Sequence, residues 1–63
     1  MKYKIGDLVK IDMDKARIYS GADLIGQVAN IRSGLYHVVF RSGDLVAFTE
    51  EEILRKVYIS ELD

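Results

Sequence analysis

Only a few side chains in this sequence could perform chemistry, and their spacing does not assemble a catalytic group. His37 is the only imidazole among the 63 residues, and there is no cysteine to act as a nucleophile. Ser33 and Ser42 each precede a glycine, which is typical of a turn rather than of an activated serine. Catalysis needs a nucleophile, a base and a stabilising group held together. We therefore predict that the chain is not an enzyme and that His37 is a surface residue of a strand.

The carboxylates do not indicate a metal site either. Asp12 and Asp14 have the spacing that opens a calcium-binding loop, but such a loop needs glycine at its sixth position and glutamate at its twelfth. The sequence has Arg17 and Asp23 at those positions. The run at 50–52 is all glutamate, which suits the first turn of a helix. We predict no metal, no cofactor and no small-molecule substrate.

Basic side chains suggest a first candidate surface, which would bind nucleic acid. Residues 15–43 hold four bases and one acid, although six acids and two bases in 44–63 bring the net charge to −1. Arginine beside an exposed tyrosine can hold a phosphate backbone and stack on a base. The candidates lie in the long loop 12–24 and at two turns: Lys15, Arg17, Tyr19, Arg32 and Arg41. The alternative is that these bases are scattered and only solvate the surface.

Apolar side chains suggest a second candidate surface, which would bind protein. Where one face of a sheet enters the core, residues of the other face are expected to be polar, but several here are apolar. They are Leu8, Val39, Leu45 and Ala47. A contiguous exposed apolar patch usually marks an interface. The alternative is that the sheet curls enough to bury the patch, or that the C-terminal residues cover it.

Alternation of apolar and polar residues predicts an all-β fold of five short strands. Val9 and Ile11, for example, are separated by a lysine and followed by an aspartate. Turns containing glycine separate the segments, which lie near 7–12, 25–32, 35–41, 45–49 and 56–59. Thr49 and Glu52 have capping-box spacing, so one short helical turn is expected before the last strand. The length fits a single domain over 1–63, and the lack of cysteine excludes a disulfide-stapled mini-protein.

The turns also predict the strand register. A two-residue turn at 33–34 with a β-bulge at 29–30 sets Val28 against Val38, which keeps the apolar residues on one face. A three-residue turn at 42–44 sets Phe48 against Val38 and Val46 against Phe40. The predicted core is Ile5, Val9, Ile11, Val28, Ile31, Tyr36, Val38, Phe40, Val46, Phe48, Ile53 and Val57.

The segments G-D-L-V-K-I at 6–11, I-G-Q-V-A-N-I at 25–31 and F-T-E-E-E-I at 48–53 resemble the SH3-like barrel superfamily, near its KOW and Tudor-type modules. This resemblance covers residues 5–59 and implies a five-stranded barrel with a helical turn before the last strand. It does not specify one function, because such barrels host many binding roles. RNA-binding KOW modules tend to carry Lys or Arg where this chain has Gln27. Outside the predicted core, Tyr3, Tyr19 and Tyr58 are the free aromatics. The size and style also resemble stand-alone proteins of bacteriophages and mobile elements.

The leading hypothesis is a small non-catalytic module for protein–protein interaction, acting as an adaptor, modulator or inhibitor. Its partner would be another protein or a second copy of the chain, bound at the apolar strand face. The alternative is a nucleic-acid-binding accessory domain of KOW-like type. No apolar run approaches the roughly 20 residues of a membrane span, and no apolar segment follows Lys2 and Lys4 as in a secretory signal. A cytoplasmic location is therefore expected.

Overall fold

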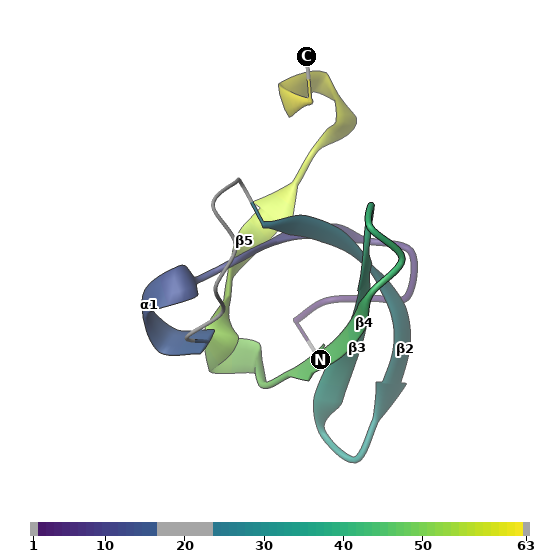
Figure 1. Cartoon of the computed structure of the whole chain (residues 1–63), viewed down its shortest axis with the longest axis vertical. Helices are drawn as coiled ribbons and strands as arrows, with labels where there is room; N and C mark the ends of the chain where they lie inside the picture. Colours follow the sequence, from purple (N-terminus) through teal and green to yellow (C-terminus); the bar gives the residue numbers. More distant parts are fainter. Residues whose placement is uncertain (1, 17–23, 63) are drawn as a thin grey trace.

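The computed structural model describes residues 2–16 and 24–62, and it contains one antiparallel sheet of five strands. The strands are β1 (Leu8–Ile11), β2 (Ile25–Arg32), β3 (Leu35–Phe40), β4 (Leu45–Phe48) and β5 (Ile53–Val57). Their order is β4-β3-β2-β1-β5, and the sheet curves strongly so that one face surrounds the core (Figure 1). The predicted all-β class is confirmed. The sheet is not closed, because no pairing between described residues joins the edge strands β4 and β5.

Three short helical segments accompany the sheet: α1 (Met13–Ala16), η1 (Glu50–Glu52) and η2 (Ile59–Glu61). The helical turn predicted before the last strand is η1, a 3-10 turn in which a Glu52 carboxylate oxygen accepts hydrogen bonds from the backbone N–H and hydroxyl of Thr49 at 2.8 and 3.1 Å. Neither α1 nor η2 was expected. Asp12 precedes α1 and caps it, since its carboxylate accepts the Asp14 N–H at 3.1 Å, and this capping was missed because the helix has only four residues.

The hairpin between β2 and β3 has the predicted turn and register. Ser33 and Gly34 both have positive φ, 52° and 78°, which is the type I′ geometry that matches the twist of antiparallel strands. Val28 pairs with Val38 and Ile31 pairs with Tyr36, and the register shifts between Val28 and Asn30. The bulge at 29–30 is therefore confirmed.

The register predicted between β3 and β4 was wrong by two residues. Phe48 pairs with Tyr36 rather than Val38, and Val46 pairs with Val38 rather than Phe40. The loop is Arg41-Ser42-Gly43: the Phe40 N–H donates to the Asp44 carbonyl at 2.9 Å, and Gly43 has φ 95°. A three-residue hairpin loop favours glycine at its third position, where φ is positive, and that preference could have located this loop. A shift of two residues preserves the faces, so Phe48 is still buried.

The observed core shares most of its residues with the predicted one. It contains Tyr3, Val9, Ile11, Leu24, Val28, Tyr36, Val38, Phe48 and Ile53, with Ile31 and Phe40 packed against it. Two predicted core residues are wrong: Ile5 is 63% exposed, because it lies within the tight turn that leads into β1, and Val46 is 37% exposed, because β4 is an edge strand.

The last strand lies earlier than predicted, at Ile53–Val57 instead of 56–59. Its pattern was hidden because it is an edge strand whose three central residues, Leu54, Arg55 and Lys56, are all exposed. Only its first and last residues are buried, and its pairing with β1 contains an irregularity between Lys10 and Ile11.

Candidate protein-binding face

The candidate binding face is the outer side of the sheet, opposite the core. The register aligns Leu8 with Gln27, Gln27 with Val39, and Val39 with Leu45. Because side chains alternate along a strand, these residues point away from Val9 and Val38, which are fully buried. Three of the four predicted residues thus lie in one cross-strand row through β1, β3 and β4.

From the sequence, Gln27 was noted only because RNA-binding KOW modules tend to carry Lys or Arg at that position. Its position in this row was not predicted. It joins Leu8 to Val39 across β2. Its side-chain amide donates to the Gly6 carbonyl at 3.1 Å, so one polar group is held within an otherwise apolar row. The signal available in the sequence was a single polar residue, Gln27, between Gly26 and Val28.

Ala47, the fourth predicted residue, lies in the next row of the same face. It pairs with His37, which in turn pairs with Asn30. Ala47 is exposed and His37 is half-buried, so His37 is an outer-face strand residue, as the sequence predicted. The apolar character therefore ends within one step of the Leu8–Leu45 row, where the face becomes polar.

Exposure differs among the members of the row, and Gln27 on β2 is exposed. Leu8 and Val39 are half-buried, whereas Leu45 is 59% exposed. A groove of about 500 Å³ runs over the middle of the row and is lined by Leu8, Gln27, Val39 and, from the C-terminal end, Leu62. The face is thus a partly covered groove with an open apolar end at β4, a form between the two alternatives that the sequence left open.

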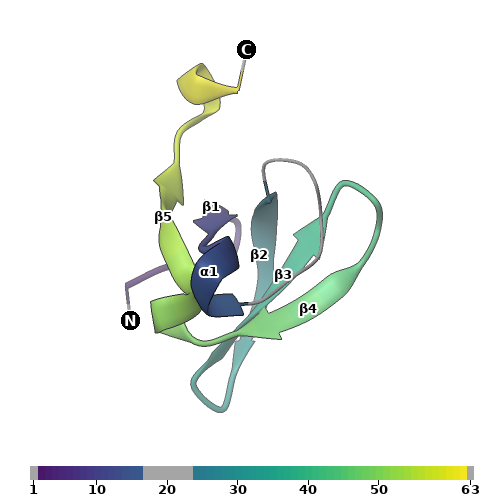
Figure 2. The ribbon, with the colours of Figure 1, turned by 60° about the vertical axis from the view of Figure 1, so that its left-hand side comes forward.

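The C-terminal turn η2 is tied to the end of β5 by Glu61. The Glu61 carboxylate pairs with Arg55 at 2.8 Å and accepts the Tyr58 N–H at 2.7 Å. The hydrogen bond from Tyr58 and the Arg55 guanidinium lower the pKa of Glu61. The turn η2 stands beyond the end of β5, away from the sheet (Figure 2), and it leaves Ile59 79% exposed.

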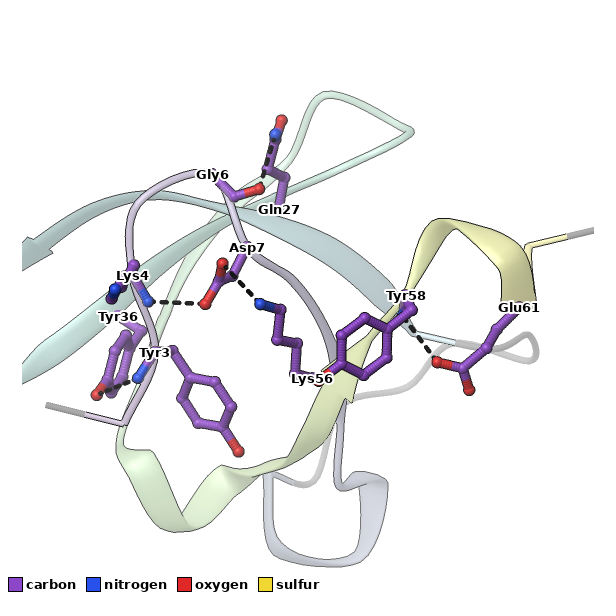
Figure 3. Close-up of polar contacts among 9 residues, drawn as sticks. All are labelled: Tyr3, Lys4, Gly6, Asp7, Gln27, Tyr36, Lys56, Tyr58 and Glu61. Carbon is purple, nitrogen blue, oxygen red and sulfur yellow. Dashed lines mark hydrogen bonds and ion pairs between the residues drawn. The ribbon is translucent and has the colours of Figure 1, made fainter.

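The start of β1 is fixed by a second polar cluster (Figure 3). The Asp7 carboxylate accepts the Lys4 N–H at 2.9 Å and lies 3.5 Å from the Lys56 ammonium. The Lys4 hydrogen bond, more than the Lys56 charge, lowers the pKa of Asp7. This cluster ties β1 to the edge strand β5, and it therefore sets the position from which Leu8 enters the row.

The structure separates the members of the predicted basic surface that it describes. Arg32 ends β2 and Arg41 follows β3, so these two exposed arginines lie at opposite ends of β3. Lys15 lies on α1 and lines a groove that also contains Glu50 and Glu51. Two further candidates, Arg17 and Tyr19, lie outside the described residues.

The prediction that Tyr3 is a free aromatic is wrong. Its side chain is 3% exposed and packs edge-to-face on Tyr36, with ring centroids 5.4 Å apart. The Tyr3 N–H also donates to the Tyr36 hydroxyl at 3.4 Å. An aromatic so close to the chain start was not assigned to the core, because no strand pattern surrounds it. Tyr58 is exposed and Tyr19 lies outside the described residues.

Within residues 2–16 and 24–62, no three His, Asp or Glu side chains are grouped as metal ligands would be. None of the helices in that part of the chain has the length and apolar character needed to cross a membrane. Comparison with protein-family models, with curated proteins and with solved structures finds no match to this chain. The residues themselves therefore carry the functional argument.

Proposed function

We propose that this chain is a small non-catalytic binding module of the SH3-like barrel type, which recognises another protein through its outer sheet face. The strand order β4-β3-β2-β1-β5 and the 3-10 turn before β5 support the barrel type, because a curved five-stranded sheet of this order needs only its two edges to meet for closure. The proposed role is that of an adaptor, modulator or inhibitor.

The observation that carries this proposal is the cross-strand row of Leu8, Val39 and Leu45. Val39 and Leu45 are direct cross-strand neighbours on the face that the core does not use, and Leu8 lies in the same row on the far side of Gln27. Burial of an exposed leucine side chain contributes about 1.5–3 kcal/mol, so a complementary apolar side chain of a partner would gain most at Leu45. Two polar side chains, Gln27 within the row and His37 beside it, would orient that partner.

The test compares Val39→Asp with Leu54→Asp. Val39 is central to the row, whereas Leu54 is an exposed leucine on the edge strand β5, away from the row. Each immobilised variant is incubated with an extract of its source cells, and circular dichroism checks that it is folded. Proteins retained by the wild type and by Leu54→Asp should be lost on Val39→Asp. The same proteins on all three chains would refute the proposed face.

Nucleic-acid binding is the second candidate, supported by the exposure of Arg32 and Arg41. Their separation along β3 favours a protein partner over this alternative. Fluorescently labelled single- and double-stranded DNA and RNA should show no binding at low salt, where phosphate contacts are strongest. Low-salt binding that weakens in Arg32→Gln or Arg41→Gln would reverse the order of the two candidates.

A further inference from the structure

Strand β4 is an open edge with few of the features that prevent edge-to-edge association. It forms one end of the strand order and has no partner on its outer side among the described residues. Its sequence, Leu-Val-Ala-Phe, has no charge and no proline. Proteins usually protect such edges with charged residues, prolines or bulges, because unpaired backbone groups otherwise recruit another strand. The opposite edge, β5, does carry charges, at Arg55 and Lys56.

The hydrogen bonds of the β3–β4 hairpin show which backbone groups of β4 are unpaired. The Phe40 N–H donates to the Asp44 carbonyl at 2.9 Å. In an antiparallel ladder, hydrogen-bonded pairs recur at every second residue, so the next such pair is Val38 with Val46. The N–H and C=O groups of the intervening residues, Leu45 and Ala47, therefore point away from β3 toward the open edge.

We propose that a second copy of this chain pairs with that edge, with the two β4 strands antiparallel about a two-fold axis. In the register that satisfies the outward groups, Leu45 of each copy pairs with Ala47 of the other, and the two Val46 residues face each other. This arrangement uses both outward residues of each strand. It also explains what would cover Val46, which points to the core side of the sheet and yet is 37% exposed.

The charges at the ends of β4 are complementary in this arrangement. The loop before the strand carries Arg41, and the 3-10 turn after it begins with Glu50 and Glu51. Two-fold antiparallel pairing brings the Arg41 end of each copy to the glutamate end of the other. A net charge of −1 per chain adds little general repulsion between the copies. One more charged group lies near this end of β4: the Asp44 carboxylate, which accepts a hydrogen bond from the Ser42 hydroxyl at 3.0 Å.

This inference does not rest on the proposed protein-binding face, because it uses the backbone edge of β4 rather than the outward side chains of the row. The two can fail separately. Val39 lies on β3, two residues before the hairpin loop, and not on the open edge. Val39→Asp is therefore expected to leave self-association unchanged, whereas it should remove the binding of another protein. A monomeric wild type would refute the dimer and leave the protein-binding test intact.

The first test measures mass in solution by sedimentation equilibrium over a range of protein concentrations. The mass should rise from the 7.2 kDa of one chain to twice that value. Ala47→Pro should stay at the mass of one chain, because proline removes an outward N–H without removing a bond to β3. The matched control Ala47→Ser keeps the N–H and should associate like the wild type. A wild type that remains a monomer, or Ala47→Pro that still doubles in mass, would overturn the proposal.

The second test needs no variant and so does not depend on the folding of Ala47→Pro. Amide hydrogen exchange is followed by NMR in dilute and concentrated samples. The Leu45 and Ala47 amides should exchange about tenfold more slowly when about nine-tenths of the chains are dimeric, because exchange then occurs from the remaining monomer. The Leu54 amide on the other edge should be unaffected. Unchanged exchange at Leu45 and Ala47, or slowing only after an unrelated extended peptide is added, would refute pairing by a second copy.

Discussion

Gly26 is a residue at which this fold depends on the absence of a side chain. It lies opposite Phe40, where β2 and β3 approach closely. A Cβ atom built at this position would overlap the Val38 side chain and lie 2.8 Å from the Val39 carbonyl oxygen. Since the second contact is with backbone, a side-chain rotation cannot relieve it. The glycine thus permits the close pairing that places Val39 in the outer row.

We expect Gly26→Ala to lower the free energy of unfolding by about 3 kcal/mol, because the strands must separate to admit the methyl group. Urea denaturation followed by circular dichroism measures this change. The comparison is Gly34→Ala, where φ is 78° but no atom lies within 4 Å of the added Cβ. That substitution should cost only about 1 kcal/mol of backbone strain. Equal losses at the two sites would show that steric overlap is not the cause.

The Glu61 carboxylate makes the position of η2 depend on pH. Its pKa lies below the ordinary 4.5, because the folded chain offers the Tyr58 N–H and the Arg55 guanidinium to the ionised form. The folded pKa is depressed, so the stabilisation is present above the ordinary value and is lost as pH falls through the folded value. The segment should therefore stay attached at neutral pH.

We expect the amide resonances of 59–62 to shift as the pH falls below about 4.5, when the protonated Glu61 releases η2. The side-chain carboxyl resonance of Glu61, followed by NMR, should titrate with a pKa below 4.5. Arg55→Gln should raise that pKa, and Glu61→Gln should show the released resonances at all pH values. Identical titrations in the wild type and Arg55→Gln would contradict this role of the ion pair.

At the scale of elements, the two Ser-Gly pairs that flank β3 form different turns. In the β2–β3 turn Ser33 adopts φ 52°, the only positive φ of a non-glycine residue among those described. In the β3–β4 loop Ser42 has no such geometry, and Gly43 alone has positive φ. The two identical dipeptides thus adopt different conformations because their loops differ in length, and the length of each loop sets the register of the strand that follows.

We expect Ser33→Asn to raise the free energy of unfolding by about 0.5–1 kcal/mol, since asparagine tolerates positive φ in a type I′ turn better than serine does. Ser42→Asn is the matched control, because the same exchange occurs there without the positive φ. Thermal unfolding of both variants measures the difference. A gain at Ser42 as large as that at Ser33 would indicate a cause other than turn geometry.

The individual strands also show which parts of the fold could be predicted from the sequence pattern. Alternation located β1 to β4 and the bulge at 29–30, because the face of each strand depends only on which residues are apolar. It did not locate β5, whose middle residues are all exposed, nor the exact β3–β4 register, which depends on where Gly43 falls in its loop. The row of Leu8, Val39 and Leu45 could be predicted as a face, but the contribution of Gln27 required the pairing of three strands.

At the scale of the whole molecule, stability is expected to be small. A chain of 63 residues has a free energy of unfolding of about 3–9 kcal/mol. Among residues 2–16 and 24–62, the largest fully buried side chains are Tyr36 and Phe48, which pair with each other across β3 and β4. The loss of one such side chain therefore removes a large part of the total.

We expect Phe48→Ala to cost about 3–5 kcal/mol and to leave the chain largely unfolded at 37 °C. Circular dichroism with urea denaturation is the measurement. Leu45→Ala removes a similar volume from the same strand, but at a side chain that is 59% exposed, and should cost less than about 1 kcal/mol. A cooperative transition retained by Phe48→Ala at the wild-type urea midpoint would show that this ring does not anchor the core.

The strand order has a further consequence for the time course of folding. Strands β2, β3 and β4 are joined by loops of two and three residues, whereas β1 and β5 pair Leu8 with Val57 across most of the chain. Closing so long a loop costs more entropy than closing a hairpin, so we expect the β2–β3–β4 meander to form first and β5 to dock last. In the native protein β5 should then be the first strand to detach, which makes the segment after Glu52 the natural starting point for proteolysis.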